Sequence, residues 1–190
     1  MKIMVPNKII KIVLPCFYIF FLIVFNSDDC RSQTNKIIDS LTNLITSIDE
    51  NSLSIDKKKY IYCQIAAIYK DISPEKSIEL YNKSLEIAIE QGDLQKQAEI
   101  LKNIGSVYLL KLIDYNKALE FYNKSLIISK QTNDMDAMAA CYNNIGVTYN
   151  RMGQYDKAIE NQLFQLKINE ESGNKKGIAI SNSNIGNIYN

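Results

Sequence analysis

The sequence has 190 residues, of which 46% are apolar, enough for one domain with a continuous core. Its 22 Lys and Arg residues nearly balance 21 Asp and Glu residues, which argues against a nucleic-acid-binding protein with its clustered basic excess. The chain contains no His, which excludes histidine-based metal sites, catalytic triads and imidazole acid–base chemistry. We therefore expect no catalytic residues, no metal site and no cofactor.

Residues 1–32 differ chemically from the rest of the chain. Lys2, Lys8 and Lys11 form a basic start, and an apolar run covers residues 12–25, extended upstream by Ile9 and Ile10. This order is typical of a secretory signal, with cleavage expected before Gln33. The segment predicts an exported protein, periplasmic or extracytoplasmic, whose N-terminus engages the export machinery or the membrane.

An uncleaved membrane anchor is the main alternative for this segment. Residues 9–25 would form a helix of about 26 Å at about 1.5 Å per residue, short of a hydrocarbon core of about 30 Å. Lipidation at Cys30 is a third alternative, and it fits poorly because Asp28 and Asp29 directly precede the cysteine.

Residues 33–56 are predicted to form an N-terminal capping helix and a linker. Apolar residues recur at helical spacing, namely Ile37, Ile38, Leu41, Leu44, Ile45 and Ile48. A helical repeat array needs a cover over the outer face of its first repeat, and we expect this helix to supply it.

A six-residue pattern recurs through the rest of the chain. It reads NIGSVY at 103–108, NIGVTY at 144–149 and NIGNIY at 184–189, with QIAAIY at 64–69 as an upstream copy. A second block follows the first three copies, as EKSIELY at 75–81, NKALEFY at 116–122 and DKAIENQ at 156–162. Apolar residues at three- and four-residue steps predict a helix for each block. We therefore predict an all-α fold, an α-solenoid of antiparallel helix pairs, over residues 57–190.

The repeats are expected at 57–92, 93–133 and 134–173, with a truncated fourth at 174–190. Gly92-Asp93 and Gly173-Asn174 each join a helix-stopping glycine to a capping residue for the next helix, and Ser73 is expected to cap a helix that begins at Pro74. Cys63 and Cys141 lie two repeats apart, too far for a disulfide, and are expected to be buried free thiols.

These repeats resemble the tetratricopeptide repeat family in a longer variant of about 40 residues, which implies a right-handed superhelix. The matching positions are Leu101, Ile104, Gly105, Tyr108, Ala118, Tyr122 and Ser125 in the second repeat, and Tyr142, Ile145, Gly146, Tyr149 and Ala158 in the third. Gln162 and Gln165 depart from the family pattern, in place of an aromatic and a small residue, and predict looser packing there.

The resemblance implies a non-catalytic scaffold that binds a protein or peptide in its concave groove. In the family the position of Asn103, Asn144 and Asn184 faces that groove, and an Asn side chain both donates and accepts hydrogen bonds to a peptide backbone. The alternative is a set of solvated Asn residues in an Asn-rich chain. The predicted partner-binding residues are Gln64, Lys102, Asn103, Ser106, Asn143, Asn144, Val147, Asn150, Arg151, Asn184 and Asn187.

Two further expectations concern the chain as a whole. Repeats of this type also form the sensory input of membrane-associated signalling proteins, histidine kinases or transcription regulators, whose output domain would lie outside this sequence. Residues 174–190 lack a second helix and a polar cap, so we expect their apolar surface to promote self-association or to be covered by further sequence.

Overall fold

The computed structural model describes residues 36, 38–40, 42–47 and 54–189. These residues form helices and turns and no strand, and they fall into one unit that ends at Leu53 and a second that begins at Ser54. In the first unit, residues 36–47 are helical wherever they are described, as predicted, while their capping role stays a prediction. The segment at residues 1–32 lies outside the described residues. No helix among those described is both long and apolar enough to span a bilayer.

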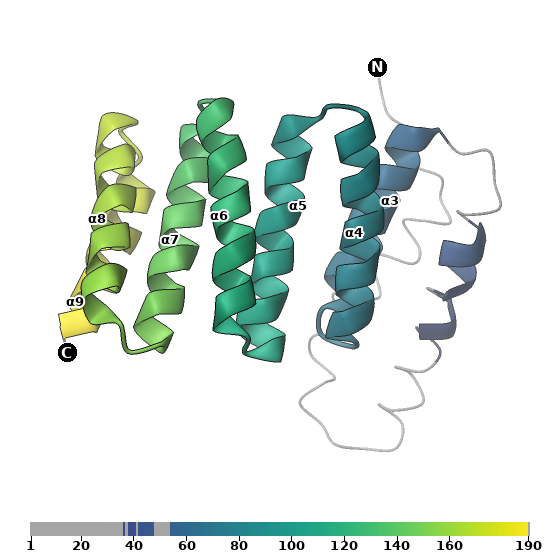
Figure 1. The fold of residues 1–190 in the computed structure, drawn as a ribbon, viewed down its shortest axis with the longest axis horizontal. Helices are drawn as coiled ribbons and strands as arrows, with labels where there is room; N and C mark the ends of the chain where they lie inside the picture. Colours follow the sequence, from purple (N-terminus) through teal and green to yellow (C-terminus); the bar gives the residue numbers. More distant parts are fainter. Residues whose placement is uncertain (1–35, 37, 41, 48–53, 190) are drawn as a thin grey trace. The chain divides into compact units, whose positions relative to one another are not determined.

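The second unit is a row of antiparallel helices, which stand side by side in chain order in Figure 1. They are α3 Ile55–Tyr69, α4 Pro74–Glu90, α5 Leu94–Val107 with the π-helical turn η1 Tyr108–Leu112, α6 Tyr115–Gln131, α7 Met135–Arg151, α8 Tyr155–Glu171 and α9 Lys175–Tyr189. We call α3, α5, α7 and α9 the A helices, and α4, α6 and α8 the B helices. The predicted all-α solenoid is confirmed.

Turn residues set the helix boundaries. Gly92 and Gly173 adopt left-handed backbone angles, with φ of 64° and 68°, as predicted. Asp93 accepts a hydrogen bond from the Lys96 backbone N at 3.0 Å, and Asn174 accepts one from the Gly177 N at 2.9 Å, so both cap the next helix. Ser73 does precede α4, but its side chain makes no capping hydrogen bond, which corrects that part of the prediction.

Small residues of the A helices let the B helices approach closely. A Cβ atom at Gly105 would lie 2.8 Å from the ring of Tyr122, which is fully buried. A Cβ atom at Gly146 would lie 2.6 Å from Nε2 of Gln162, which is also fully buried. Both glycines are therefore packing positions, at which an added side chain would force the facing side chain or the B helix itself to shift.

The packing around Gln162 and Gln165 is tight, contrary to our expectation of looseness. Gln162 occupies the place of Tyr122 in its repeat and donates a hydrogen bond to the carbonyl of Asn143 at 3.3 Å. Gln165 is 5% exposed, and its buried Oε1 has no hydrogen-bond partner among the residues that the structure describes. The departure from the family pattern therefore leaves both Gln side chains buried, and its cost is a buried acceptor on Gln165 that lacks a hydrogen bond.

Both cysteines of the array are free and buried, as predicted. Sγ of Cys63 lies 3.1 Å from Oγ of Ser84, and Sγ of Cys141 lies 3.2 Å from Oγ of Ser125. Burial raises the pKa of both thiols above the usual value. Each therefore stays protonated and behaves as a small apolar residue at neutral pH.

Candidate functional site

The A helices α5, α7 and α9 approach one another more closely than successive B helices do. Cα atoms of α5 and α7, and of α7 and α9, come within 8 Å of one another at several positions, whereas successive B helices do so at isolated points at most. From α5 to α9 the array is therefore tighter on its A side, which is the side that the family resemblance implies to be the inner one.

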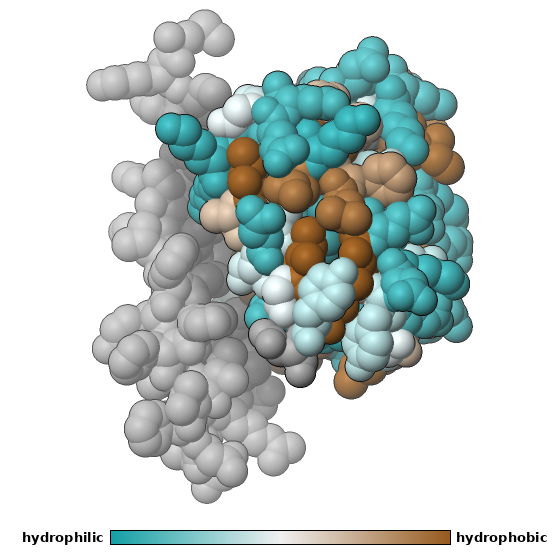
Figure 2. All heavy atoms as spheres, turned by 90° about the vertical axis from the view of Figure 1, so that its left-hand side faces the viewer, coloured by the Kyte–Doolittle hydropathy of each residue, from teal (hydrophilic) through white to brown (hydrophobic). Residues whose placement is uncertain are grey.

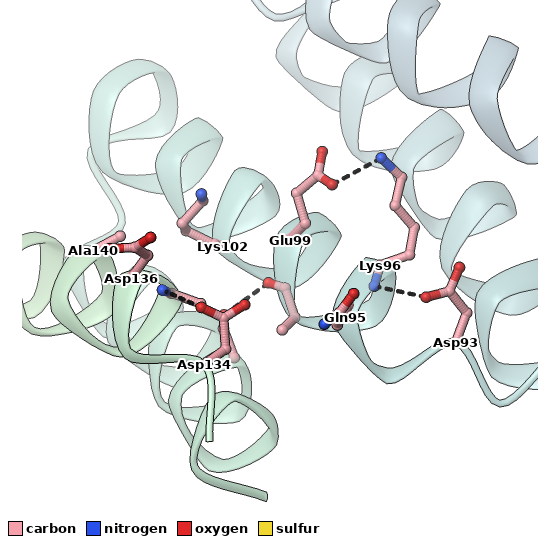
Figure 3. A pocket seen from close by; sticks show the side chains of 11 residues that line it. Asp93, Gln95, Lys96, Glu99, Lys102, Asp134, Asp136 and Ala140 are labelled. Carbon is pink, nitrogen blue, oxygen red and sulfur yellow. Dashed lines mark hydrogen bonds and ion pairs between the residues drawn. The ribbon is translucent and has the colours of Figure 1, made fainter. Parts of the chain in front are cut away.

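A pocket of about 600 Å³ opens between the N-terminal halves of α5 and α7 (Figure 3). We call it the α5–α7 groove. It is lined by Asp93, Gln95, Lys96, Ala98, Glu99, Lys102, Ser125, Asp134, Asp136, Ala137 and Ala140.

Several charged groups of the groove have structural partners. Asp93 accepts from Nζ of Lys59 at 2.6 Å, and this hydrogen bond is the main reason why the pKa of Asp93 is lowered. Lys96 pairs with Glu99 at 2.8 Å, and Asp134 caps α7 by accepting from the Ala137 N at 2.9 Å. These groups position the walls of the groove and are less available to a ligand.

Three polar side chains of the groove make no hydrogen bond or ion pair within the described part of the chain. Gln95 and Lys102 lie on α5, and Asp136 lies on the facing helix α7. Ser125, by contrast, donates to the carbonyl of Ala98 at 2.7 Å. The groove therefore offers an amide, an ammonium and a carboxylate to a ligand.

Of the predicted binding residues, Lys102 lines the groove. Asn103 follows it, is half-buried, and makes no side-chain hydrogen bond to the described residues. Ser106 lies one turn further along α5, where its Oγ donates to the Lys102 carbonyl at 3.0 Å and accepts from the Tyr122 hydroxyl at 3.1 Å. Ser106 is therefore engaged in packing the helix pair.

Three predicted residues form a cluster of amides at the next repeat interface. Nδ2 of Asn184 donates to Oδ1 of Asn143 at 2.8 Å and to Oε1 of Gln162 at 3.3 Å, and Asn143 donates to Oδ1 of Asn144 at 3.4 Å. Asn184 thus joins α9 to α7 and α8. Asn103, Asn144 and Asn184 are equivalent in sequence but make different hydrogen bonds. That these three Asn side chains together hold a peptide backbone stays a prediction.

The remaining predicted residues lie apart from the groove. Gln64, Arg151 and Asn187 are exposed, whereas Val147 and Asn150 are half-buried. Val147 packs against the core cluster around Tyr122. The structure therefore gathers only part of the predicted set around one cavity.

Sequence reasoning missed the N-terminal half of the groove. Gln95 and Glu99 lie seven and three residues before Lys102, and Asp136 and Ala140 stand in the same relation to Asn143. Residues at these spacings share one face of a helix. Following the helical faces that carry Lys102 and Asn143 two turns toward the N-termini of their helices would have identified these residues. Within the described part of the chain, no group of three or more His, Cys, Asp or Glu residues is placed to hold a metal.

Comparison with protein families adds to this geometry. The profile of the soluble NSF attachment protein (SNAP) family matches residues 43–176, more than half of the chain. The chain belongs to the SNAP family. This family has helical repeats of tetratricopeptide type, so the resemblance stated from the repeats is confirmed. No curated protein sequence matches the chain.

Solved structures share the fold at low sequence identity. BtubC (BKLC) from P. vanneervenii matches with a TM-score of 0.67 and 22% identity, over 85% of this chain and 68% of BtubC. A Rap protein complexed with Competence and Sporulation Factor matches with 0.64 and 18%, over 84% of this chain and 44% of the Rap protein. A signal transduction ATPase with a tetratricopeptide repeat sensor, from Pyrococcus horikoshii, matches with 0.65 and 16%, over 97% of this chain and 28% of the ATPase.

Proposed function

We propose that the array is a non-catalytic scaffold that binds a peptide, or an extended segment of a protein, in the α5–α7 groove. The observation that carries this proposal is the pair Lys102 and Asp136, which stand on neighbouring A helices without ion-pair partners among the described residues. The groove volume of about 600 Å³ suits a few residues of an extended ligand.

The chemistry of the groove fits a peptide backbone. The Lys102 ammonium can donate to a carbonyl or carboxylate oxygen, and the Asp136 carboxylate can accept from backbone N–H groups. The amide of Gln95 can do both. Opposite charges on facing walls orient a ligand more than they strengthen its binding, so we expect moderate affinity.

The comparisons support a binding role without naming the partner. The Rap protein of similar fold is complexed with Competence and Sporulation Factor, and the SNAP family is named for attachment to another protein. Neither partner is proposed for this chain, because the Rap protein is 18% identical, which shows the fold alone, and the family match ties no residue of the groove to a partner.

The test is a peptide selection against the purified chain. Peptides enriched from a random library are measured by fluorescence anisotropy against the wild type and against Lys102→Ala and Asp136→Ala. Each variant should weaken binding about 5- to 30-fold, since a lost charged hydrogen bond costs roughly 1–2 kcal/mol. Lys167→Ala, an exposed lysine on α8, is the matched control. Peptides that bind all variants equally well would refute the groove assignment.

A sensory input region is the second candidate. The repeat sensor of the signal transduction ATPase from Pyrococcus horikoshii has a similar fold, which favours this reading. The groove would then bind a ligand and pass the signal to an output domain. The downstream reading frame is the discriminating observation: a kinase or DNA-binding domain there supports the sensor, and its absence supports the stand-alone scaffold.

Export is part of the proposal. The basic and apolar order of residues 1–32 supports a leader cleaved before Gln33, with an anchor through residues 9–25 as the rival. Cell fractionation followed by N-terminal sequencing distinguishes them, because a mature chain that starts at Gln33 supports cleavage. A full-length chain in the cytoplasm would contradict export altogether.

A further inference from the structure

The outer side of the B helices differs between repeats. Four positions of each B helix, three, four and seven residues apart from the first, share one helical face. They are Glu79, Asn82, Lys83 and Glu86 in α4, Glu120, Asn123, Lys124 and Ile127 in α6, and Glu160, Leu163, Phe164 and Lys167 in α8. The centre of this face is therefore Asn-Lys in α4 and in α6, and Leu-Phe in α8.

The α8 face is exposed because of its place on the B helix. In α6, which has a repeat on either side, all four equivalent positions are exposed, so further repeats beside α8 would leave its face open as well. In α8, Leu163 is 51% exposed and Phe164 is 45% exposed. Figure 2 views the array from the end where α8 and α9 lie and shows hydrophobic residues at its surface. Two apolar side chains thus occupy surface positions that are polar in the other B helices.

The exchange also leaves the charges of the α8 face without close partners. In α6, Nζ of Lys124 lies 2.6 Å from Oε1 of Glu120, one turn away. In α8 the residue one turn after Glu160 is aromatic, and Glu160 makes no ion pair within the described part of the chain. The ion pair of Lys167 with Glu171 is long, at 4.0 Å. A carboxylate and an ammonium therefore flank the two apolar residues and are available to a partner.

The order of these four residues is complementary to itself. Glu160 and Lys167 are equally far, about 5 Å along the helix axis, from the midpoint between Leu163 and Phe164. When two copies of α8 pack antiparallel about a two-fold axis level with that midpoint, Glu160 of each copy lies opposite Lys167 of the other. Leu163 and Phe164 of both copies meet at the centre. The face thus supplies both halves of its own contact.

Charges farther along α8 contribute little net attraction. In the same arrangement the first turn of one copy, with Asp156 and Lys157, lies near the last turn of the other, with Glu170 and Glu171. One like-charged and one oppositely charged pairing result, and they offset each other. The four residues of the face therefore decide the association.

We propose that the outer face of α8, formed by Glu160, Leu163, Phe164 and Lys167, joins two copies of this chain in an antiparallel, two-fold symmetric dimer. Charge complementarity identifies the second copy as the occupant. The face is small beside the roughly 1,200–2,000 Å² of a standard interface, so the dimer is weak, with a dissociation constant on the order of 100 µM. None of the residues that line the α5–α7 groove lies on α8, so peptide binding and dimer formation can each fail without the other.

Sedimentation of the full chain at concentrations up to millimolar measures the dimer. Glu160→Lys and Lys167→Glu each turn two attractions of the symmetric dimer into two repulsions, so each should weaken association about 10- to 30-fold. An equimolar mixture of the two variants restores opposite charges at both places and should associate as the wild type does. Because both side chains are exposed, the melting temperature of each single variant should match that of the wild type.

Apolar variants test the centre of the face. Leu163→Asn introduces the residue that α4 and α6 carry at this position, and it should weaken the dimer about fivefold or more because it removes apolar area from both copies. Ile127→Asn, which changes an exposed apolar residue on α6, is the matched control and should change association less than about twofold.

Three outcomes would overturn the proposal. One is a wild-type chain that stays monomeric up to millimolar concentration. Another is association that neither charge variant weakens, which would place the contact elsewhere, for example in the apolar run of residues 9–25. The third is a mixture of the two charge variants that associates no better than either variant alone, which would exclude the antiparallel pairing.

Discussion

The turn between α5 and α6 contains a backbone conformation that its residue disfavours. Ile113 has a φ of 53°, in the left-handed region, where a β-branched side chain crowds the backbone. The corresponding turn of the third repeat uses Gly153 at a φ of 71°. Ile113 is 64% exposed, so little burial offsets the strain.

We predict that Ile113→Gly raises the free energy of unfolding by about 0.5–1 kcal/mol. Removing the strain of the left-handed conformation stabilises the folded state by about 1–2 kcal/mol. The greater backbone freedom of glycine in the unfolded chain offsets part of this gain. Urea denaturation measures the change. Ile113→Val keeps the β-branch and should show no gain. A loss of stability in the glycine variant would mean that contacts of the Ile113 side chain outweigh the strain.

The glycines of the A helices allow a second prediction at this scale. Gly146→Leu should destabilise the array by about 2 kcal/mol or more, because the new side chain must displace Gln162 and the backbone of α8. Gly186→Leu, at the equivalent place with open space, should cost nothing measurable. Thermal unfolding of the two variants provides the comparison, and equal melting temperatures would contradict the assigned helix pairing.

Helices α3 and α5 are joined through one carboxylate. Asp93 caps α5 by accepting from the Lys96 N and also accepts from Nζ of Lys59 on α3, which itself donates to Oε1 of Gln91 at 2.5 Å. Lys59 is 9% exposed, so its charge is matched inside the helix interface. The first turn of α5 therefore depends on an ion pair from the preceding repeat.

This arrangement predicts a pH-dependent contribution to stability. The pKa of Asp93 is lowered in the folded chain, chiefly by the hydrogen bond from Lys59, so the ion pair stabilises the fold above the ordinary Asp pKa of about 4 and is lost as pH falls through the lower folded value. Asp93→Asn should cost about 0.5–1 kcal/mol at pH 7, a value reduced by the partial exposure of Asp93, and less in acid.

Urea denaturation of wild type and Asp93→Asn at pH 7 and pH 3 checks this expectation. The difference in unfolding free energy between the two proteins should shrink at pH 3. If the difference in unfolding free energy between wild type and Asp93→Asn is the same at both pH values, Asp93 stabilises the fold through its helix-capping hydrogen bond and not through its charge.

The array as a whole should differ in protection along its length. In a solenoid each repeat is stabilised by its neighbours, and α9 has a neighbour on one side only among the described residues. We predict that amides of residues 178–189 exchange with solvent faster than those of residues 100–110. Hydrogen exchange on a monomeric sample measures this, and equal protection at both places would contradict it.

Local chemistry explains why much of the fold could be predicted. Apolar residues at three- and four-residue steps indicate a helix wherever they occur, and Gly92-Asp93 and Gly173-Asn174 act within a few residues of themselves. The repeated glycines also predicted close helix pairs. A glycine inside a helix lowers the stability of that helix, and the loss is offset where the missing side chain lets another helix approach closely.

The candidate site depended on geometry that no single helix contains. The sequence by itself determined the helices, their turns, the repeat register and the helical face that carries Lys102. Only the tertiary structure determined that Asp136 faces Lys102 across a groove, that Asn184 is bonded to Asn143 and Gln162, and that Gly186 is uncovered. Contacts between helices depend on interhelical distance and rotation, which many packed side chains set together, so a repeated residue need not have repeated partners.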